Sequence, residues 1–187
     1  MLPWPQTTAA GSQPASSAFV TGKVAPVKSS LVTPDGKATY LALGEKATVV
    51  VAMATWCKYC AYMDKWVLPA LATGSGVEVD VVDVSQTGGI ANPGPRVPAF
   101  SGTDGSGATT LSESGMEVEL RTYIIKYALA QSGINFYAAP SSTQRQWHIS
   151  AFPTVVVLNS DGIVSLQQPG AMTLAELTAA VHDASSH

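Results

Sequence analysis

The sequence predicts an α/β fold in which a central mixed β-sheet is flanked by helices. Two observations carry this prediction. Short apolar, β-branched runs alternate with helical patterns, and a tight turn joins the last two of these runs. The chain has 187 residues, a length that suits one domain. Only 12% of the residues are charged, and the net charge is −3. Because phosphate binding needs clustered Lys and Arg, this composition argues against a nucleic-acid partner.

The N-terminal segment differs in composition from the rest. Residues 1–30 are rich in Ala, Ser, Thr, Pro and Gly, and they carry no charge before Lys23. Such a segment buries too little apolar surface to offset its ordering entropy, so we expect a flexible tail or linker. The alternative is a strap that packs on the domain through Trp4, Phe19 and Val20.

The domain is expected over residues 31–187. The apolar run 47–54 is typical of a strand buried on both faces, and residues 159–162 (NSDG) are typical of a hairpin turn. Residues 114–117 and 173–176 have the spacing of capping boxes at helix N-termini. In order, we expect a turn at 33–36, strands at 38–43 and 47–54, a helix at 57–68 ended or kinked by Pro69, a strand at 77–84, a helix at 114–131, a strand at 134–137, a short helix at 141–148, strands at 154–158 and 163–166, and a last helix from 173.

A long loop interrupts this alternation. Residues 85–113 are rich in Gly, Pro, Ser and Thr, and their only charged residues are Arg96, Asp104 and Glu113. Loops of this length are uncommon in compact domains and are usually functional or disordered. We expect a loop insertion that covers the functional site or docks a partner, with a merely flexible insertion as the alternative.

The two cysteines lie in the motif Trp56-Cys57-Lys58-Tyr59-Cys60, where a buried strand meets the first turn of a helix. Free N–H groups and the helix dipole stabilise an anion there, and the pKa of such C-x-x-C cysteines is depressed to about 3.5–7.5. The charge of Lys58 should favour the thiolate as well. Three-residue spacing brings the sulfurs close enough to form a disulfide. We therefore expect Cys57 to be an exposed nucleophile and Cys60 a buried resolving thiol.

A C-x-x-C pair can also be half of a zinc site or a structural disulfide. A zinc site needs two further ligands, but the sequence has no second cysteine pair, and its histidines are scattered at 148, 182 and 187. A bridge across so short a loop stabilises little. Redox chemistry is therefore favoured, with no metal and no cofactor beyond the redox-active disulfide.

A second motif is Phe152-Pro153-Thr154, at the start of a predicted strand. A proline there is unusual, because it removes a hydrogen-bond donor from the sheet. A cis peptide bond before Pro153 would expose the preceding backbone to a ligand. A trans proline at a sheet edge is the alternative.

With both motifs in this order, residues 31–187 resemble the thioredoxin-like superfamily. Residues 56–60 resemble its active-site motif, and residues 147–154 resemble the segment around its cis-proline. Residues 31–37 and 122–149 are similar to the N-terminal hairpin and the insertion of exported, often membrane-tethered thiol–disulfide oxidoreductases related to TlpA and ResA. The expected fold is thus a thioredoxin fold with an N-terminal β-hairpin and an inserted loop, helix and strand before the cis-proline.

The resemblance implies a mechanism and partners. Cys57 attacks a partner disulfide, Cys60 resolves the mixed disulfide, and Pro153 shapes the substrate groove. The residues that line the groove and tune the pair are Trp56, Lys58, Tyr59, Phe152, Pro153 and Thr154. We expect a monomer that meets protein substrates outside the cytoplasm, a redox partner that resets the pair, and an export signal or membrane tether lying outside this chain.

The sequence departs from the thioredoxin pattern near the cysteines. Val51 stands where thioredoxins have a buried acid, so Asp80, Asp83 or a water molecule is expected to take the proton of Cys60. Ordinary solvent exposure is the alternative for both aspartates. Between the cysteines, Lys-Tyr replaces Gly-Pro, which predicts a reduction potential above the roughly −270 mV of thioredoxin.

Two other functions occur on this fold. A copper carrier similar to the Sco proteins would use Cys57, Cys60 and His148, although that family spaces its cysteines one residue wider. A peroxidase is disfavoured, because peroxiredoxin-like sites have Thr where this chain has Ala54.

Overall fold

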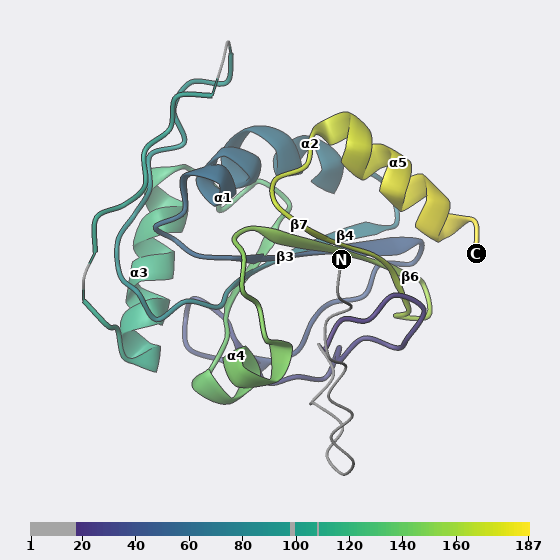
Figure 1. Ribbon diagram of the computed structural model, residues 1–187, viewed down its shortest axis with the longest axis horizontal. Coiled ribbons are helices and arrows are strands. Elements are labelled where there is room, and N and C mark those ends of the chain that lie inside the picture. Colours follow the sequence, from purple (N-terminus) through teal and green to yellow (C-terminus); the bar gives the residue numbers. More distant parts are fainter. Residues whose placement is uncertain (1–17, 98–99, 108) are drawn as a thin grey trace, which may run out of the picture.

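The computed structural model describes residues 18–97, 100–107 and 109–187. Its centre is a seven-stranded sheet with the order β2-β1-β5-β4-β3-β6-β7 (Figure 1). The strands are β1 (Leu31–Val32), β2 (Ala38–Thr39), β3 (Ala47–Met53), β4 (Val77–Asp83), β5 (Asn135–Ala138), β6 (Thr154–Asn159) and β7 (Val164–Pro169). The helices are α1 (Lys58–Tyr62), the π-helical turn η1 (Met63–Val67), α2 (Leu68–Ala72), α3 (Glu113–Lys126), α4 (Ser141–Trp147) and α5 (Leu174–Ser185).

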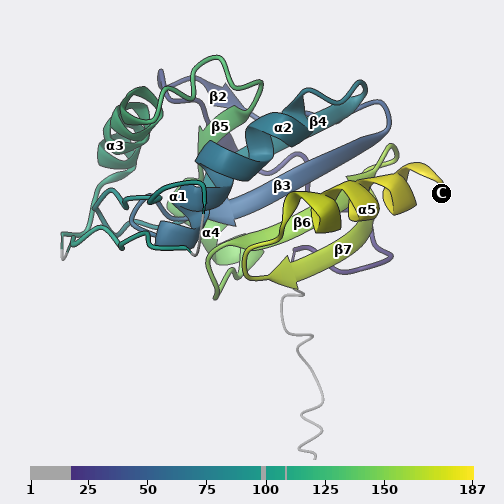
Figure 2. The same ribbon diagram turned by 90° about the horizontal axis from the view of Figure 1, so that it is seen from above.

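The sheet is mixed, and its central strand β3 is buried along its whole length. β3 pairs in parallel with β4 and antiparallel with β6, as expected for an apolar run buried on both faces. Side chains alternate between the faces, so Val51 and Met53 face the core under α1, α2, α3 and α5. Val50 and Ala52 face a second core on the other side of the sheet, together with Trp147 of α4. α4 lies on the opposite side of the sheet from α1, α2 and α5 (Figures 1 and 2). The predicted α/β fold with a central mixed sheet is confirmed.

The helical segment after the cysteines is longer than predicted. It continues beyond Pro69 to Ala72, because Pro69 lies in the first turn of α2, where a missing N–H disrupts nothing. The turn before it is π-helical, and the Leu68 N–H reaches the Met63 carbonyl. Such turns are rare and often occur at functional sites.

Residues 18–30 pack on the domain, which corrects the prediction of a flexible tail over 1–30 for this part. Phe19 is fully buried, and its ring meets Trp147 of α4 edge-on at 4.8 Å. The Gly22 N–H also donates to the Val164 carbonyl at 2.8 Å. Val20, by contrast, is exposed, and Trp4 lies outside the described residues. One buried aromatic ring and strand-like hydrogen bonds therefore hold a segment that lacks apolar periodicity.

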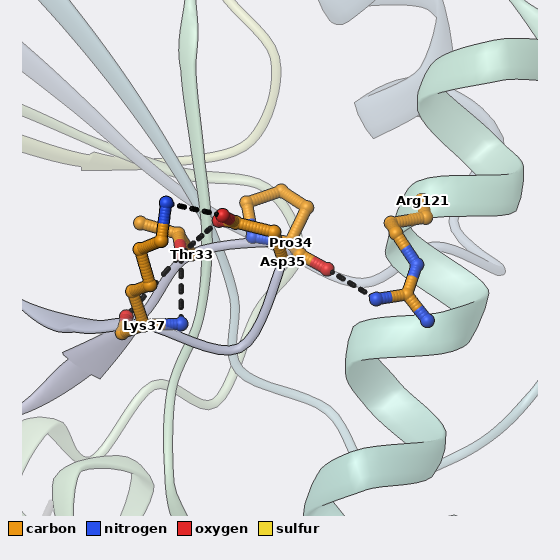
Figure 3. A network of polar contacts seen from close by, with 5 residues as sticks. All are labelled: Thr33, Pro34, Asp35, Lys37 and Arg121. Atoms are coloured by element: carbon orange, nitrogen blue, oxygen red, sulfur yellow. Dashed lines mark hydrogen bonds and ion pairs between the residues drawn. The ribbon is translucent and has the colours of Figure 1, made fainter.

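The N-terminal hairpin forms as predicted and is tied to α3. Its turn is closed by the Thr33 N–H, which donates to the Lys37 carbonyl at 2.8 Å, and by an ion pair of the same length between Asp35 and Lys37 (Figure 3). Arg121 of α3 donates to the Pro34 carbonyl at 2.8 Å. The predicted strand over 38–43 is shorter, because β2 ends at Thr39.

The later helices follow their capping signals with one shift. The cap of α3 is Ser112 rather than Ser114, and its side chain accepts from the Gly115 N–H at 3.1 Å. α3 ends at Lys126, before the predicted residue 131, and Ala128 just beyond has a positive φ of 55°. In α5 the predicted capping box is confirmed, with reciprocal bonds between residues 173 and 176.

Candidate active site

The cysteine pair lies at the N-terminus of α1, immediately after β3. Cys57 is the N-cap residue, and its sulfur accepts from the backbone N–H of Cys60 at 3.3 Å. Cys60 lies within α1 and is fully buried in the core between the helices and the sheet, together with Val51 and Met53 of β3. Both cysteines are free thiols, so the structure describes the reduced pair.

The pKa values of the two thiols are shifted in opposite directions. Hydrogen bonding from the Cys60 side chain, helped by the backbone N–H groups of Cys60 and Tyr59, lowers the pKa of Cys57. Burial, with a contribution from the neighbouring Cys57, raises the pKa of Cys60 well above its usual range. This arrangement makes Cys57 the more readily ionised of the two thiols and keeps the proton on Cys60, as a nucleophile and a resolving group require.

Cys57 is not exposed as predicted, since only 3% of its surface is accessible. The long loop accounts for the difference, because it crosses the residues on either side of Cys57. The Gly105 N–H donates to the Trp56 carbonyl at 2.8 Å, and Asp104 accepts from the Lys58 backbone N–H at 2.9 Å. The loop therefore lies over the N-terminus of α1.

The described part of this loop forms a tight two-limbed ribbon that projects beside α1 and α3 (Figure 1). Bridges pair Thr87 with Thr110 and Asn92 with Thr103. A Cβ on Gly107 would lie 1.6 Å from the Gly88 carbonyl oxygen. Only glycine permits so close an approach of the two limbs. We call residues 85–112 the glycine ribbon.

Aromatic stacking joins the glycine ribbon to α1. Phe100 stacks on Tyr59 with ring centroids 4.6 Å apart, and it meets Tyr62 edge-on at 5.4 Å. The Lys58 ammonium lies 5.3 Å from the Tyr59 ring and 5.9 Å from the Phe100 ring. The Lys58 ammonium thus packs against these two rings. Asp104 of the glycine ribbon brings a negative charge that raises the pKa of Cys57. The charge of Asp104 thus opposes the activation of the thiolate that the sequence leads us to expect from Lys58.

Replacing Asp104 with Asn should lower the pKa of Cys57, because Asn removes the charge and keeps an acceptor for the Lys58 N–H. Since Asp104 is exposed, the effect should shrink as salt is added. A lower thiolate pKa stabilises the reduced form, so the reduction potential should rise. The pH dependence of alkylation by iodoacetamide measures the pKa. Asp183→Asn on the exposed side of α5 is the control, and an unchanged Asp104→Asn profile would contradict the assignment.

The proline motif lies against the cysteine motif. The Phe152–Pro153 peptide bond is cis, and the Phe152 ring meets Trp56 edge-on at 5.7 Å. The Trp56 ring is also held by its Nε1–H, which donates to the Ser85 hydroxyl at 3.0 Å. Thr154 is buried, with its hydroxyl bonded to the Ala151 carbonyl at 2.8 Å. The structure therefore brings all the predicted site residues from 56–60 and 152–154 into one region.

A groove opens beside this region. The Gly170 N–H donates to the Pro153 carbonyl at 2.7 Å, and the chain after Gly170 forms one wall. The groove has a volume of about 370 Å³ and a mainly apolar lining from Tyr59, Tyr62, Val67, Phe100, Ala171, Met172, Thr173 and Leu174. It thus runs from the cysteine helix to the segment that follows the last strand.

The other residues singled out in the sequence lie elsewhere. His148 is exposed at the end of α4, and the described residues contain no group of three His, Cys, Asp or Glu side chains that could hold a metal ion. Asp80 and Asp83 are both fully buried, so ordinary solvent exposure is wrong for each. Asp80 shares a sheet face with Val50, on the side of α4 and away from Cys60.

Three residues near the cysteines were missed from the sequence: Asp64, Phe100 and Asp104. Asp64 follows Cys60 by four residues on one helical segment, a spacing that puts two side chains on the same face. That signal was available. Phe100 and Asp104 reach the site only through the path of the glycine ribbon, which no local pattern predicts.

Within the described ranges, none of the helices has the length and apolar character needed to cross a membrane.

Comparisons with known proteins agree with this geometry. No curated protein sequence matches the chain significantly. Among solved structures, a secreted Mycobacterium tuberculosis disulfide oxidoreductase described as homologous to E. coli DsbE is 16% identical, with a TM-score of 0.54 over 84% of this chain and 96% of that one. StoA from Bacillus subtilis is 16% identical, with a TM-score of 0.53 over 81% and 93%. The exposed lipoprotein thioredoxin Etrx1 from Streptococcus pneumoniae is 17% identical, with a TM-score of 0.51 over 82% and 97%.

These likenesses establish the fold. The family model of the thioredoxin-like domain matches residues 34–185, which is most of the chain and includes both motifs of the site. The protein therefore belongs to the thioredoxin-like domain family.

Proposed function

We propose that the protein is a thiol–disulfide oxidoreductase that exchanges a Cys57–Cys60 dithiol with disulfides of protein substrates. The observation that carries this proposal is the division of roles within the pair. Cys57 caps a helix and has a lowered pKa, whereas Cys60 is fully buried one turn on with a raised pKa. Neither a structural disulfide nor a metal site needs this difference.

The reaction proceeds in two exchanges. The Cys57 thiolate attacks one sulfur of the substrate disulfide, and the other substrate sulfur leaves as a thiolate. Cys60 then attacks Cys57, which breaks the mixed disulfide and releases the second substrate thiolate. The protein ends as the Cys57–Cys60 disulfide, and the substrate has gained two electrons. A redox partner with a dithiol resets the pair by the reverse exchanges.

The groove beside the site gives the substrate a place to bind. Its lining is mainly apolar and includes Tyr59 next to the nucleophile and Met172 beyond the cis-proline segment. An extended substrate segment with an apolar side chain near its cysteine suits this groove. The role proposed for the neighbouring residues is to orient the substrate sulfur; they are Trp56, Lys58, Phe152, Pro153 and Thr154.

We further infer a location outside the cytoplasm. Disulfide exchange on proteins suits an oxidising compartment, where protein disulfides persist. Two of the structural neighbours are described as secreted and as an exposed lipoprotein, which supports the same location for this chain. The proposal includes an export signal or anchor supplied outside these residues and a protein that acts as a monomer without a further cofactor.

The Cys60→Ser variant tests the exchange mechanism. Without a resolving thiol, Cys57 should remain bound to the substrate after attacking one of its disulfides, so a stable mixed disulfide with insulin should accumulate. Non-reducing electrophoresis and intact mass would detect it. The wild-type protein should catalyse insulin reduction by dithiothreitol, and Cys57→Ser should abolish both the trapping and the catalysis. An absence of trapped species together with an absence of insulin reduction would contradict the proposed function.

A further inference from the structure

A buried acid lies beside the resolving cysteine. Asp64 in η1 follows Cys60 by four residues, a spacing that puts their side chains on the same side of the helical segment. Both residues are fully buried. The charge of Asp64 contributes to the raised pKa of Cys60, so the two groups interact electrostatically. Val51, where thioredoxins have an acid, is buried in β3 and supplies no proton acceptor.

The Asp64 carboxylate has one oxygen held in place and one oxygen free. The Tyr123 hydroxyl of α3 donates to Oδ2 of Asp64 at 2.6 Å. The other oxygen, Oδ1, is buried and has no hydrogen-bond partner among the described residues. A buried carboxylate oxygen without a partner is costly, and its presence needs an explanation. A proton that arrives on Oδ1 during the reaction would provide one.

Burial raises the pKa of Asp64 to about 7, against the lowering effect of the Tyr123 hydrogen bond. A carboxyl group with this pKa is both partly ionised at neutral pH and a strong enough base to take up a proton. An ordinary exposed aspartate is a much weaker base. The environment therefore gives Asp64 the proton affinity that a general base near neutral pH requires.

We propose that Asp64 accepts the proton of the Cys60 thiol when Cys60 resolves the mixed disulfide, and that Tyr123 positions the carboxylate. This inference rests on the proposed function. In the step, the Cys60 S–H bond breaks and its proton passes to Asp64, directly or through one water molecule. The Cys60 sulfur bonds to the Cys57 sulfur, and the substrate sulfur leaves with the electron pair of the broken disulfide. In the reverse direction, Asp64 returns the proton to Cys60.

The other buried acids are less well placed. Asp80 lies on the opposite face of the sheet. Asp83, at the end of β4, shares the face of Met53, but Asp64 is the carboxyl group whose charge contributes to the raised pKa of Cys60. The titratable groups that interact with Asp64 and Cys60 are Cys57 at the N-cap of α1 and Tyr123 of α3, which in turn faces Tyr127. Glu119 of α3 and Asp83 of β4 interact with each other.

The two chemical steps can be measured separately with dithiobis(nitrobenzoate). When the reduced protein meets an excess of this reagent, Cys57 releases the first thionitrobenzoate at a rate proportional to reagent concentration. Cys60 releases the second at a rate independent of concentration, and this rate reports the proposed proton transfer. In the wild type the second rate should rise with pH through about 7, where Asp64 ionises.

Asp64→Asn keeps the shape and the acceptor for Tyr123 but removes the base. The second rate should fall about 100-fold at neutral pH, which is within the range for loss of a general base. Its pH profile should move to the higher pKa of the unassisted Cys60 thiol. The matched control is Asp80→Asn, which removes another buried carboxyl with a pKa of about 7 and an unpartnered oxygen, and it should change neither rate.

Tyr123→Phe separates positioning from a general loss of structure. Because the Tyr123 hydrogen bond lowers the pKa of Asp64, its loss should move the midpoint of the second-rate profile to higher pH without abolishing it. This variant also carries the test if Asp64→Asn does not fold. An unchanged second rate and profile in the folded Asp64→Asn protein would overturn the proposal, as would an equal slowing of both steps. Release of a single thionitrobenzoate by the wild type would instead contradict the proposed function.

Discussion

The stability of the protein is expected to be greatest in mildly acidic solution and to fall as the pH rises from about 4 to about 7. Asp64, Asp80 and Asp83 are buried, and in each the oxygen not held by a hydrogen bond has no partner among the described residues. Burial raises the pKa of Asp64 and of Asp80 from 3.8 to about 7, and it raises the pKa of Asp83 well above its usual range.

The direction follows from proton binding. Between a pH of about 4 and about 7 the folded protein holds protons on these carboxyl groups that the unfolded chain has already released. Raising the pH therefore favours unfolding until the folded groups also ionise. A pKa that rises from 3.8 to about 7 corresponds to roughly 4 kcal/mol for Asp64 and to a similar amount for Asp80. These are large fractions of a typical domain stability of about 5–15 kcal/mol.

Urea unfolding at a pH of about 5 and of about 8 measures this difference. Asp64→Asn and Asp80→Asn should each reduce it, because an amide does not ionise. Asp161→Asn in the exposed turn between β6 and β7 is the control and should retain the wild-type pH dependence. A protein equally stable at both pH values, or more stable at the higher one, would contradict the assignment of raised pKa values to these carboxyl groups.

Replacing Phe19 with Ala should destabilise the protein by about 3–5 kcal/mol, which is the usual range for removing a fully buried aromatic side chain. The Phe19 ring fills a core formed with Trp147 of α4, and its loss leaves a cavity there. The free energy of unfolding in urea measures the effect. Surface substitutions usually change the free energy of unfolding by less than about 0.5 kcal/mol. A change this small for Phe19→Ala would mean that residues 18–30 are not part of the folded domain.

Two controls support this measurement. Val24 lies in the same segment but is 70% exposed, so Val24→Ala should change the stability little. A chain that begins at residue 31 should lose at least as much stability as Phe19→Ala, because it lacks the buried Phe19 ring. This truncation tests by free energy whether residues 18–30 belong to the domain.

The fold was largely predictable because its signals are local. The apolar run of β3, the turn at residues 159–162 and the capping box of α5 each specify their own structure through short-range contacts. The cysteine motif specified the N-terminus of α1 in the same way. Errors arose where distant residues decide the outcome. Residues 18–30 have no periodic pattern of apolar residues, yet Phe19 packs into a core formed by Trp147 and by strands from elsewhere in the chain.

The same contrast between short-range signals and contacts of distant residues explains which part of the site was predictable. Helix capping determines where the Cys57 thiolate forms, so the sequence predicts it. The direction of the Lys58 side chain depends on Phe100, which arrives from the glycine ribbon. The burial of Asp64 depends on Tyr123 in α3. Such contacts between segments far apart in the chain leave no trace in a local pattern.

The glycine ribbon has a chemical consequence for the durability of the protein. A thiolate in open solvent is converted by peroxide to sulfenic acid and then, irreversibly, to sulfinic acid. The sulfur of Cys57 has thiolate character but only 3% of the residue surface is accessible, and Cys60 lies one turn away to capture any sulfenic acid as a disulfide. The first oxidation is thereby slowed and the second is intercepted. The glycine ribbon thus preserves the nucleophile through many cycles of oxidation and reduction.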